Sequence, residues 1–204
     1  MIELKNVSFQ YGDGTEALRD ISVQFPPDHI FGVLGQSGSG KTTLLNCIAR
    51  FLRPQEGQIL FNESEVNRRA VKFRNWIGYV PQEISLFQEL TAEENLKIFG
   101  GLYDIKKTEL KKRIDEVFDL VELSERRDSV VKEFSGGMKR RLNIAASLLH
   151  NPELLLCDEP TVGVDPQSRN AIFDLLQKLN KEGKTIIYTT HYMEEAERLC
   201  SRLA

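Results

Sequence analysis

The sequence predicts an α/β fold in which a mostly parallel sheet carries an antiparallel β part and a helical part. Residues 29–52 and 153–200 each alternate apolar strands with apolar-striped helices. Between them, residues 91–149 show the period of about 3.6 residues that is typical of helices. Since strands that alternate with helices pair in parallel, we expect the outer stretches to share one sheet and the helical stretch to be an insertion.

The N-terminal part is predicted to be rich in strands. Residues 2–9, 17–25 and 29–35 are predicted strands, separated by Gly/Asp and Pro-Pro turns. A helix should follow the third strand. Its apolar face consists of Leu44, Leu45, Ile48, Ala49 and Leu52. Residues 57–62 and 76–82 predict two more strands.

The rest of the chain predicts helices and then renewed alternation. Thr91 and Glu94 form a capping box at the start of the first helix. A second helix has an apolar face made of Leu110, Ile114, Val117, Phe118 and Val121. Its solvated start is expected at Lys106, Lys107, Lys111 and Lys112. Strands at 153–157 and 185–190 then alternate with helices that begin near Asp165 and Met193.

One domain of three parts is expected from this order. Residues 1–82 hold the antiparallel β part and the first part of the core, 83–150 form a helical subdomain, and 151–204 complete the α/β core. Leu203 and Ala204 look like the start of another strand, so the C-terminal strands of the core are expected to be missing.

Composition argues against several classes of function. With 27 Lys and Arg against 30 Asp and Glu, a net charge of -3 gives no basic footprint, so nucleic acid is not an expected partner. Cys47, Cys157 and Cys200 are spaced neither as a disulfide framework nor as a metal site and are expected to be reduced thiols. Because no signal peptide and no run of about 18 apolar residues is found, any membrane role would require a partner chain.

The stretch "GQSGSGKT" matches the phosphate-binding P-loop pattern, with an apolar strand before it and a helix after it. Glycines let backbone N–H groups curl around phosphate oxygens, and the helix N-terminus adds its dipole. Lys41 is expected to reach the β- and γ-phosphates, and Thr42 to offer its hydroxyl to Mg²⁺. The predicted nucleotide-binding residues here are Gly35, Gln36, Ser37, Gly38, Ser39, Gly40, Lys41, Thr42 and Thr43.

A second site motif is "LLLCDEP". A buried strand of leucines delivers Asp158 to its carboxyl end, where α/β folds bind ligands and where a carboxylate can hold Mg²⁺. Glu159 follows directly and is predicted to be the general base for an attacking water. Alone, such an acidic pair would more often cap a helix, but the P-loop favours the catalytic interpretation.

The order of these motifs, with "FSGGMKRRL" before "LLLCDEP" and with "GVDP" and His191 after it, resembles the nucleotide-binding domain of ABC transporters along essentially the whole chain. The resemblance implies a P-loop NTPase core, ATP and Mg²⁺. It implies that Tyr11 stacks on adenine, that Gln82 senses Mg²⁺ and the attacking water, and that His191 contacts the γ-phosphate. Asp165 would communicate between two cassettes. Tyr11 could also simply close a strand, and Asp165 could cap a helix.

The stretch "FSGGMKRRL" resembles the signature motif of that family, which implies head-to-tail packing of two cassettes. Ser135, Gly136 and Gly137 would then cover the γ-phosphate held by the other cassette. Phe134 and Met138 depart from the Leu and Gln that are commoner there. Met138 cannot make the hydrogen bonds of an amide, so its role is not carried over.

The expected function is that of a Mg-dependent ATPase subunit that powers export through a separate membrane permease. The chain would then form a homodimer and lie at the cytoplasmic face of the membrane. A soluble ABC ATPase that acts on nucleic acid or ribosomes is the alternative, although residues 82–135 are sized for a compact lobe. A catalytically inactive binding module is disfavoured because Lys41, Asp158, Glu159 and His191 are all present.

Overall fold

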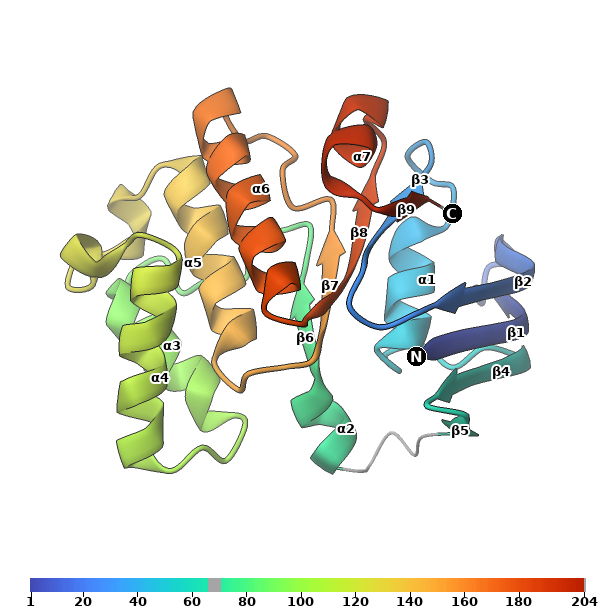
Figure 1. Cartoon of the computed structure of the whole chain (residues 1–204), viewed down its shortest axis with the longest axis horizontal. Helices are drawn as coiled ribbons and strands as arrows, with labels where there is room; N and C mark the ends of the chain where they lie inside the picture. The colour runs from blue at the N-terminus through green and yellow to red at the C-terminus, as the bar shows by residue number, and fades with distance from the viewer. Residues whose placement is uncertain (66–70, 204) are drawn as a thin grey trace.

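The computed structural model describes residues 1–65 and 71–203 and contains two sheets flanked by helices (Figure 1). The antiparallel sheet has the strand order β2-β1-β4-β5. Its strands are β1 (Ile2–Gln10), β2 (Glu16–Phe25), β4 (Glu56–Phe61) and β5 (Ser64–Glu65). The second sheet has the order β6-β7-β8-β3-β9, and every pair in it is parallel. Its strands are β3 (Ile30–Leu34), β6 (Ile77–Val80), β7 (Leu154–Asp158), β8 (Thr185–Thr190) and β9 (Arg202–Leu203).

Helices cover both faces of the parallel sheet (Figure 1). They are α1 (Lys41–Ile48), α2 (Val71–Trp76), α3 (Ala92–Gly101), α4 (Lys107–Leu120), α5 (Gly136–Leu148), α6 (Pro166–Lys181) and α7 (Met193–Leu199). Two short 3₁₀ helices are η1 (Ser124–Arg126) and η2 (Val131–Glu133). Helices α3, α4 and α5 pack against one another and are called the helical lobe below. No helix in the described part of the chain is long and apolar enough to cross a bilayer.

The parallel sheet separates two hydrophobic cores, because successive side chains of a strand point to opposite faces. In β7, Leu155 and Cys157 join the core beneath α5 and α6, whereas Leu154 and Leu156 join the core that holds α1 and the antiparallel sheet. Strand β8 divides in the same way. The inner strands of the parallel sheet are therefore buried on both faces, which explains why β7 is a continuous apolar run in the sequence.

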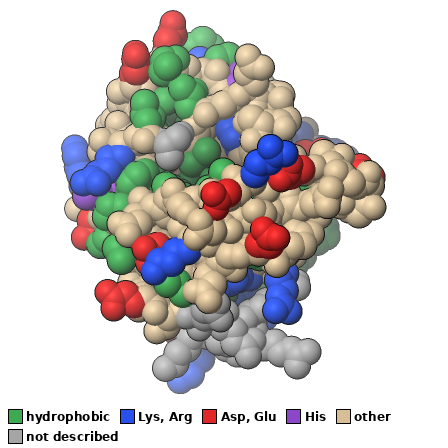
Figure 2. Space-filling view, turned by 90° about the vertical axis from the view of Figure 1, so that its right-hand side faces the viewer, with side chains coloured by type: hydrophobic (Ala, Val, Ile, Leu, Met, Phe, Trp, Pro, Cys, Tyr) green, Lys and Arg blue, Asp and Glu red, His purple; other side chains and the backbone are tan. Residues whose placement is uncertain are grey.

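The antiparallel sheet forms an outer face on which acidic and basic side chains are interspersed (Figure 2). Lys5 and Glu3 form an ion pair at 3.1 Å, and Arg19 pairs with Glu16. Neither sign of charge dominates the described part of this face, in line with the small net charge.

The predicted fold class is confirmed, with differences at several element boundaries. The capping box is present, since Glu94 N–H donates to Thr91 Oγ1 and Thr91 N–H donates to Glu94 Oε2. Leu203 pairs in parallel with Gly32, as expected for the start of a strand. The strand predicted at 76–82 is shorter, because Trp76 ends α2.

Three further differences have simple causes. Helix α1 ends at Ile48, so Leu52 lies beyond it in the following turn. Strand β5 and helix α2 were not predicted, because two and six residues are too few to show a periodic pattern.

The three cysteines are free thiols, as expected. Cys47 and Cys157 are buried, and Cys200 is half-buried.

His150 connects the helical lobe to the parallel sheet. Its ring stacks on Tyr103, with centroids 3.8 Å apart and planes inclined by 10°. Its Nε2 donates to the carbonyl oxygen of Ile77 at 2.9 Å. Burial lowers the pKa of His150 to about 4, because the charged imidazolium would lose its hydration.

The folded chain should therefore lose stability in acid through His150. The unfolded chain, with a histidine pKa of about 6.5, binds the proton first, so the contribution is complete above that pH and is lost as pH falls to about 4. We expect His150→Gln to reduce the loss of unfolding free energy between pH 7.5 and 5 by on the order of 1–2 kcal/mol. Urea denaturation at both pH values measures it, and identical acid sensitivity in variant and wild type would contradict the assignment.

Candidate nucleotide-binding and catalytic site

The predicted phosphate loop lies where β3 ends and α1 begins. The N–H of Gly35 donates to the carbonyl oxygen of Thr190, which joins the loop to the end of β8. Gly40 has a φ of 93°, and a Cβ there would lie 2.3 Å from the carbonyl oxygen of Ala17. Only glycine fits this turn, so the loop keeps its N–H groups at the start of α1.

Lys41 is buried at the base of this loop, with 6% of its surface exposed. Its Nζ donates to the carbonyl oxygens of Gly35 and Gln36 at 2.8 and 2.9 Å. It also forms an ion pair with Glu159 Oε1 at 3.1 Å. The ammonium group is thus held at the loop by oxygens, which are the partners that a phosphate would replace.

Glu159 lies between a lysine and a histidine. Its Oε2 is 3.1 Å from His191 Nδ1, and its other carboxylate oxygen contacts Lys41. Its φ of 43° is in the left-handed region, which is uncommon for a residue with a side chain. Such backbone strain is concentrated at functional sites, where the surroundings hold the residue in place. The N–H of Glu159 donates to Thr189 Oγ1 at 2.9 Å, which helps to hold this conformation.

Asp158 is 1% exposed, and its Oδ1 accepts a hydrogen bond from Thr189 Oγ1 at 2.9 Å. Thr42, by contrast, is exposed at the start of α1. Mg²⁺ in nucleotide sites commonly takes one or two protein oxygens and completes its shell with water and phosphate. A carboxylate and a hydroxyl fit that donor set. The described residues contain no cluster of three His, Cys, Asp or Glu side chains that could hold a metal without such help.

A buried network behind this site was not predicted from the sequence. Glu195, 3% exposed, accepts hydrogen bonds from the hydroxyls of Thr161, Tyr188 and Thr190 at 2.8–3.0 Å. Burial, foremost, raises the pKa of Tyr188, so its hydroxyl remains a donor. Because Thr190 precedes His191, the network holds the backbone that presents the histidine.

Tyr11 lies beside the loop and remains partly accessible, at 40% exposed. Its hydroxyl shares a hydrogen bond with Thr43 Oγ1 at 2.9 Å, and its ring meets Phe9 edge-on with centroids 5.0 Å apart. Tyr11 and Thr43, which are both predicted to belong to the nucleotide site, therefore lie side by side.

The signature residues contact a different part of the chain. Ser135 caps α5, because its Oγ accepts from the N–H of Met138 at 3.2 Å. A Cβ on Gly137 would lie 2.0 Å from Ser168 Oγ, so glycine permits close packing against the start of α6. Asp165 caps α6 by accepting from the N–H of Ser168 at 2.9 Å. Ser135 and Gly136 are exposed, so α5 presents its N-terminus to the outside.

Gln82 is exposed at the start of the loop that follows β6. Its backbone carbonyl oxygen accepts a hydrogen bond from Arg140 Nη2 at 2.6 Å, and that of Pro81 accepts from Arg140 Nη1 at 2.7 Å. The sequence showed Arg140 only as one of several cations after the glycine pair. Its contact with residues far away in the chain had no local signal.

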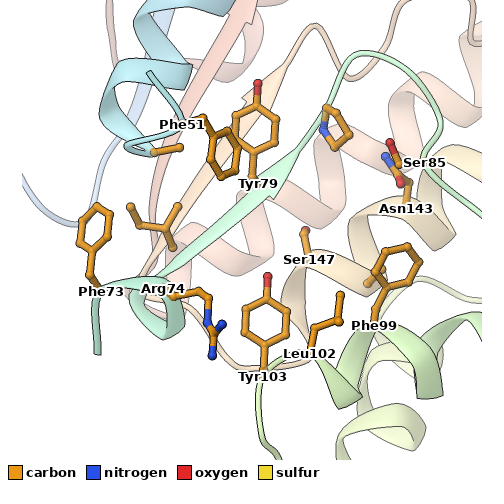
Figure 3. A pocket seen from close by; sticks show the side chains of 14 residues that line it. Phe51, Phe73, Arg74, Tyr79, Ser85, Phe99, Leu102, Tyr103, Asn143 and Ser147 are labelled. Atoms are coloured by element: carbon orange, nitrogen blue, oxygen red, sulfur yellow. The ribbon is translucent and has the colours of Figure 1, made fainter. Parts of the chain in front are cut away.

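A separate groove of about 590 Å³ lies between the end of α1, β6 and the helical lobe (Figure 3). Its wall is largely apolar, and Phe51 and Leu102 are 55% and 61% exposed. Phe51 packs edge-on against Tyr79, with ring centroids 5.3 Å apart. Asn143, also in the wall, has a buried Nδ2 without a hydrogen-bond partner. The groove therefore offers mainly apolar contact to a partner.

Comparison with known proteins gives a consistent result. The family described as ABC transporter matches residues 18–162. The chain is 45% identical over 203 residues to the linearmycin resistance ATP-binding protein LnrL of Bacillus subtilis, covering 100% of this chain and 65% of that protein. It is 38% identical over 203 residues to the Nod factor export ATP-binding protein I of Cupriavidus metallidurans, covering 100% and 67%.

An importer component is also similar. The methionine import ATP-binding protein MetN 1 of Bacillus cereus is 39% identical over 212 residues, with 100% of this chain and 61% of that protein covered. The chain therefore spans about two thirds of the length of these curated relatives, or slightly less.

Solved structures share the whole fold. The cbiO1 protein of Clostridium perfringens, part of an ABC transporter complex, superposes with a TM-score of 0.89 at 29% identity, covering 99% of this chain and 82% of that one. A dimeric ATP-binding cassette in a post-hydrolysis state with ADP and Pi gives 0.86 at 31% identity, covering 100% and 93%. With the family match over residues 18–162, these likenesses show that the chain belongs to the ABC transporter family, as one of its nucleotide-binding domains.

Proposed function

We propose that this chain binds and hydrolyses ATP to power export through a separate permease. The observation that carries the proposal is Glu159, held between Lys41 and His191 beside the phosphate loop. The direction of transport is supported by the relatives named for linearmycin resistance, at 45% identity, and for Nod factor export. Import remains the competing direction, because a methionine import protein is 39% identical.

ATP would occupy the phosphate loop. Tyr11 stacks on the adenine, and the N–H groups of the loop and of Thr43 surround the phosphates. The oxygens of the γ-phosphate replace Glu159 as the ionic partner of Lys41, which frees the carboxylate. Nucleotide binding thereby prepares the general base, since the carboxylate oxygen that contacts Lys41 becomes available to a water molecule.

Mg²⁺ fits the donor set of Thr42 and Asp158, with Gln82 as an outer contact, and when bound it would neutralise charge on the β- and γ-phosphates. Thr189 holds Asp158 in place through its hydroxyl. In the hydrolytic step, Glu159 accepts a proton from the attacking water. His191 and Gln82 orient that water against the γ-phosphate.

The active site is completed by a second copy of the chain. Ser135, Gly136 and Gly137 of one cassette cover the γ-phosphate bound by the other, and Asp165 lies at the junction. The exposed N-terminus of α5 supports this arrangement, because its dipole and free N–H groups suit an anion from outside the chain. The dimeric cassettes among the similar structures also support it.

The permease is proposed to bind the apolar groove between the core and the helical lobe. Phe51 and Leu102 are large and exposed, and both line this groove. The groove is lined by residues from both the predicted N-terminal part, 1–82, and the predicted helical subdomain, 83–150. Binding there would place the cassette at the cytoplasmic face of the membrane.

Glu159→Gln tests the general base. The amide cannot accept the proton of water, so kcat should fall by at least about 100-fold, while the affinity for ATP stays within about threefold. Phosphate release and binding of a fluorescent ATP analogue measure the two quantities. Glu182→Gln, on the exposed end of α6, is the matched control and should keep wild-type turnover. Surviving turnover in Glu159→Gln would refute the role of this residue.

Mixing two inactive variants tests the shared site. Lys41→Ala removes the ammonium group from the phosphate loop of its own chain. Ser135→Ala removes the hydroxyl that is proposed to contact the nucleotide of the neighbouring chain. In a mixed dimer the two defects fall in the same site, so the other site is intact. We expect phosphate release to reappear on mixing, up to roughly a quarter of the wild-type rate if chains pair at random. No gain over the separate variants would mean that each chain uses its own Ser135.

Leu102→Asp tests the groove. A carboxylate on this exposed residue should abolish recovery of the cassette in the membrane fraction of its native cells, because it would be buried without a partner. Turnover of the purified chain should not change. Met193→Asp, at an apolar position outside the groove that is 53% exposed, serves as the control. Membrane recovery of Leu102→Asp at the wild-type level would exclude this surface.

A further inference from the structure

Arg140 is a cation buried without a counter-ion. It is 4% exposed, and no carboxylate of the described residues forms an ion pair with it. Burial lowers the pKa of this guanidinium, because the charge loses hydration. Its two terminal nitrogens donate hydrogen bonds to the carbonyl oxygens of the consecutive residues Pro81 and Gln82, at 2.7 and 2.6 Å, rather than to a carboxylate.

The geometry of this contact is specific to arginine. The planar fork donates two parallel hydrogen bonds, which a lysine ammonium or an amide could not reproduce in the same place. Burying a charge in this way is costly for stability, so the interior does not favour it for packing alone. The contact fixes the backbone of the loop at the residue that presents the Gln82 side chain.

The remainder of the same loop is also attached to the helical lobe. The buried Asn95 of α3 accepts from Phe87 N–H at 2.8 Å and donates to Phe87 O at 3.0 Å. Farther along, the N–H of Lys132, in η2 next to the helical lobe, donates to Gln88 O at 2.9 Å. The loop from Pro81 to Leu90 is therefore bound to the helical lobe at both ends, while β6 ties it to the parallel sheet.

Arg140 belongs to the same helix that presents the signature. Helix α5 starts directly after Ser135, and five residues of helix correspond to about 7.5 Å along its axis. A displacement of the backbone at Pro81 and Gln82 therefore either moves α5 through Arg140 or breaks these two hydrogen bonds.

On the basis of the proposed function, we propose that Arg140 is a positioning residue that couples the two ATP sites of the dimer. It links Gln82, which serves the nucleotide of its own cassette, to Ser135, which serves the nucleotide of the neighbour. Occupancy of one site then sets the position of the signature at the other. ATP hydrolysis becomes cooperative through this contact.

The test compares Arg140→Met and Arg140→Lys with Arg141→Met in the full chain. Arg141 lies on the same helix, but its Nη1 donates to Val121 O at 2.8 Å, within the helical lobe. For Arg140→Met we expect kcat to fall by about 10- to 100-fold and the Hill coefficient for ATP to fall towards 1. The affinity for a fluorescent ATP analogue should change less than about twofold. Arg140→Lys, which retains the charge and one contact, should lie between Arg140→Met and the wild type.

Arg141→Met should retain the wild-type kcat and Hill coefficient, even where its thermal midpoint falls as much as that of Arg140→Met. Equal kinetic losses in both methionine variants would overturn the proposal, because they would indicate general packing. An unchanged Hill coefficient in Arg140→Met, or a wild-type coefficient of 1, would overturn it as well.

Failure of the proposed function gives a different result, namely a wild-type chain that binds ATP without hydrolysing it. In that case, amide hydrogen exchange tests whether the contact of Arg140 with Pro81 and Gln82 transmits ATP binding to the start of α5. ATP should slow exchange of the amides at 136–140 in the wild type and in Arg141→Met, but not in Arg140→Met. The same protection in all three chains would overturn the proposed link.

Discussion

The site depends on the compensation of one buried charge. Lys41 carries an ammonium group that is 6% exposed, and such a group requires oxygens on several sides. The carbonyls of Gly35 and Gln36 come from the end of β3, and the carboxylate of Glu159 comes from the end of β7. All these oxygens lie at one edge because the carboxyl ends of parallel strands coincide. The order β7-β8-β3 thus brings these oxygens together at one edge of the sheet.

Strand β8, which lies between β7 and β3, holds the acidic residues in place. Thr189 donates to Asp158 and accepts from the backbone of Glu159, so one hydroxyl positions both members of the acidic pair. The last residue of the strand, Thr190, donates to Glu195 and so joins the strand to the Glu195 network, directly before His191. The left-handed backbone at Glu159 is held by these hydrogen bonds, which accounts for its presence in an otherwise regular sheet.

The helical lobe is joined to the sheet by polar contacts as well as apolar ones. Arg140 grips the carbonyls after β6, and His150 donates to Ile77 at the start of the same strand. Packing of an apolar core permits little displacement, whereas individual hydrogen bonds can be exchanged at modest cost. The lobe is therefore joined to the sheet by a shared apolar core and by these hydrogen bonds, beside the groove where a partner would bind.

The sequence alone determined the fold class, the phosphate loop, the acidic pair and the capping box at Thr91. Each of these is a local pattern. Apolar runs predict the strands, the spacing of glycines predicts the loop, and a threonine followed three residues later by a glutamate predicts the helix cap. The tertiary structure alone decided the partners of these residues. Thr189, Glu195 and Arg140 act on groups distant in the sequence, and hydrogen bonds between distant residues leave no periodic trace. The short elements β5 and α2 were missed for the related reason that a pattern needs more residues than they contain.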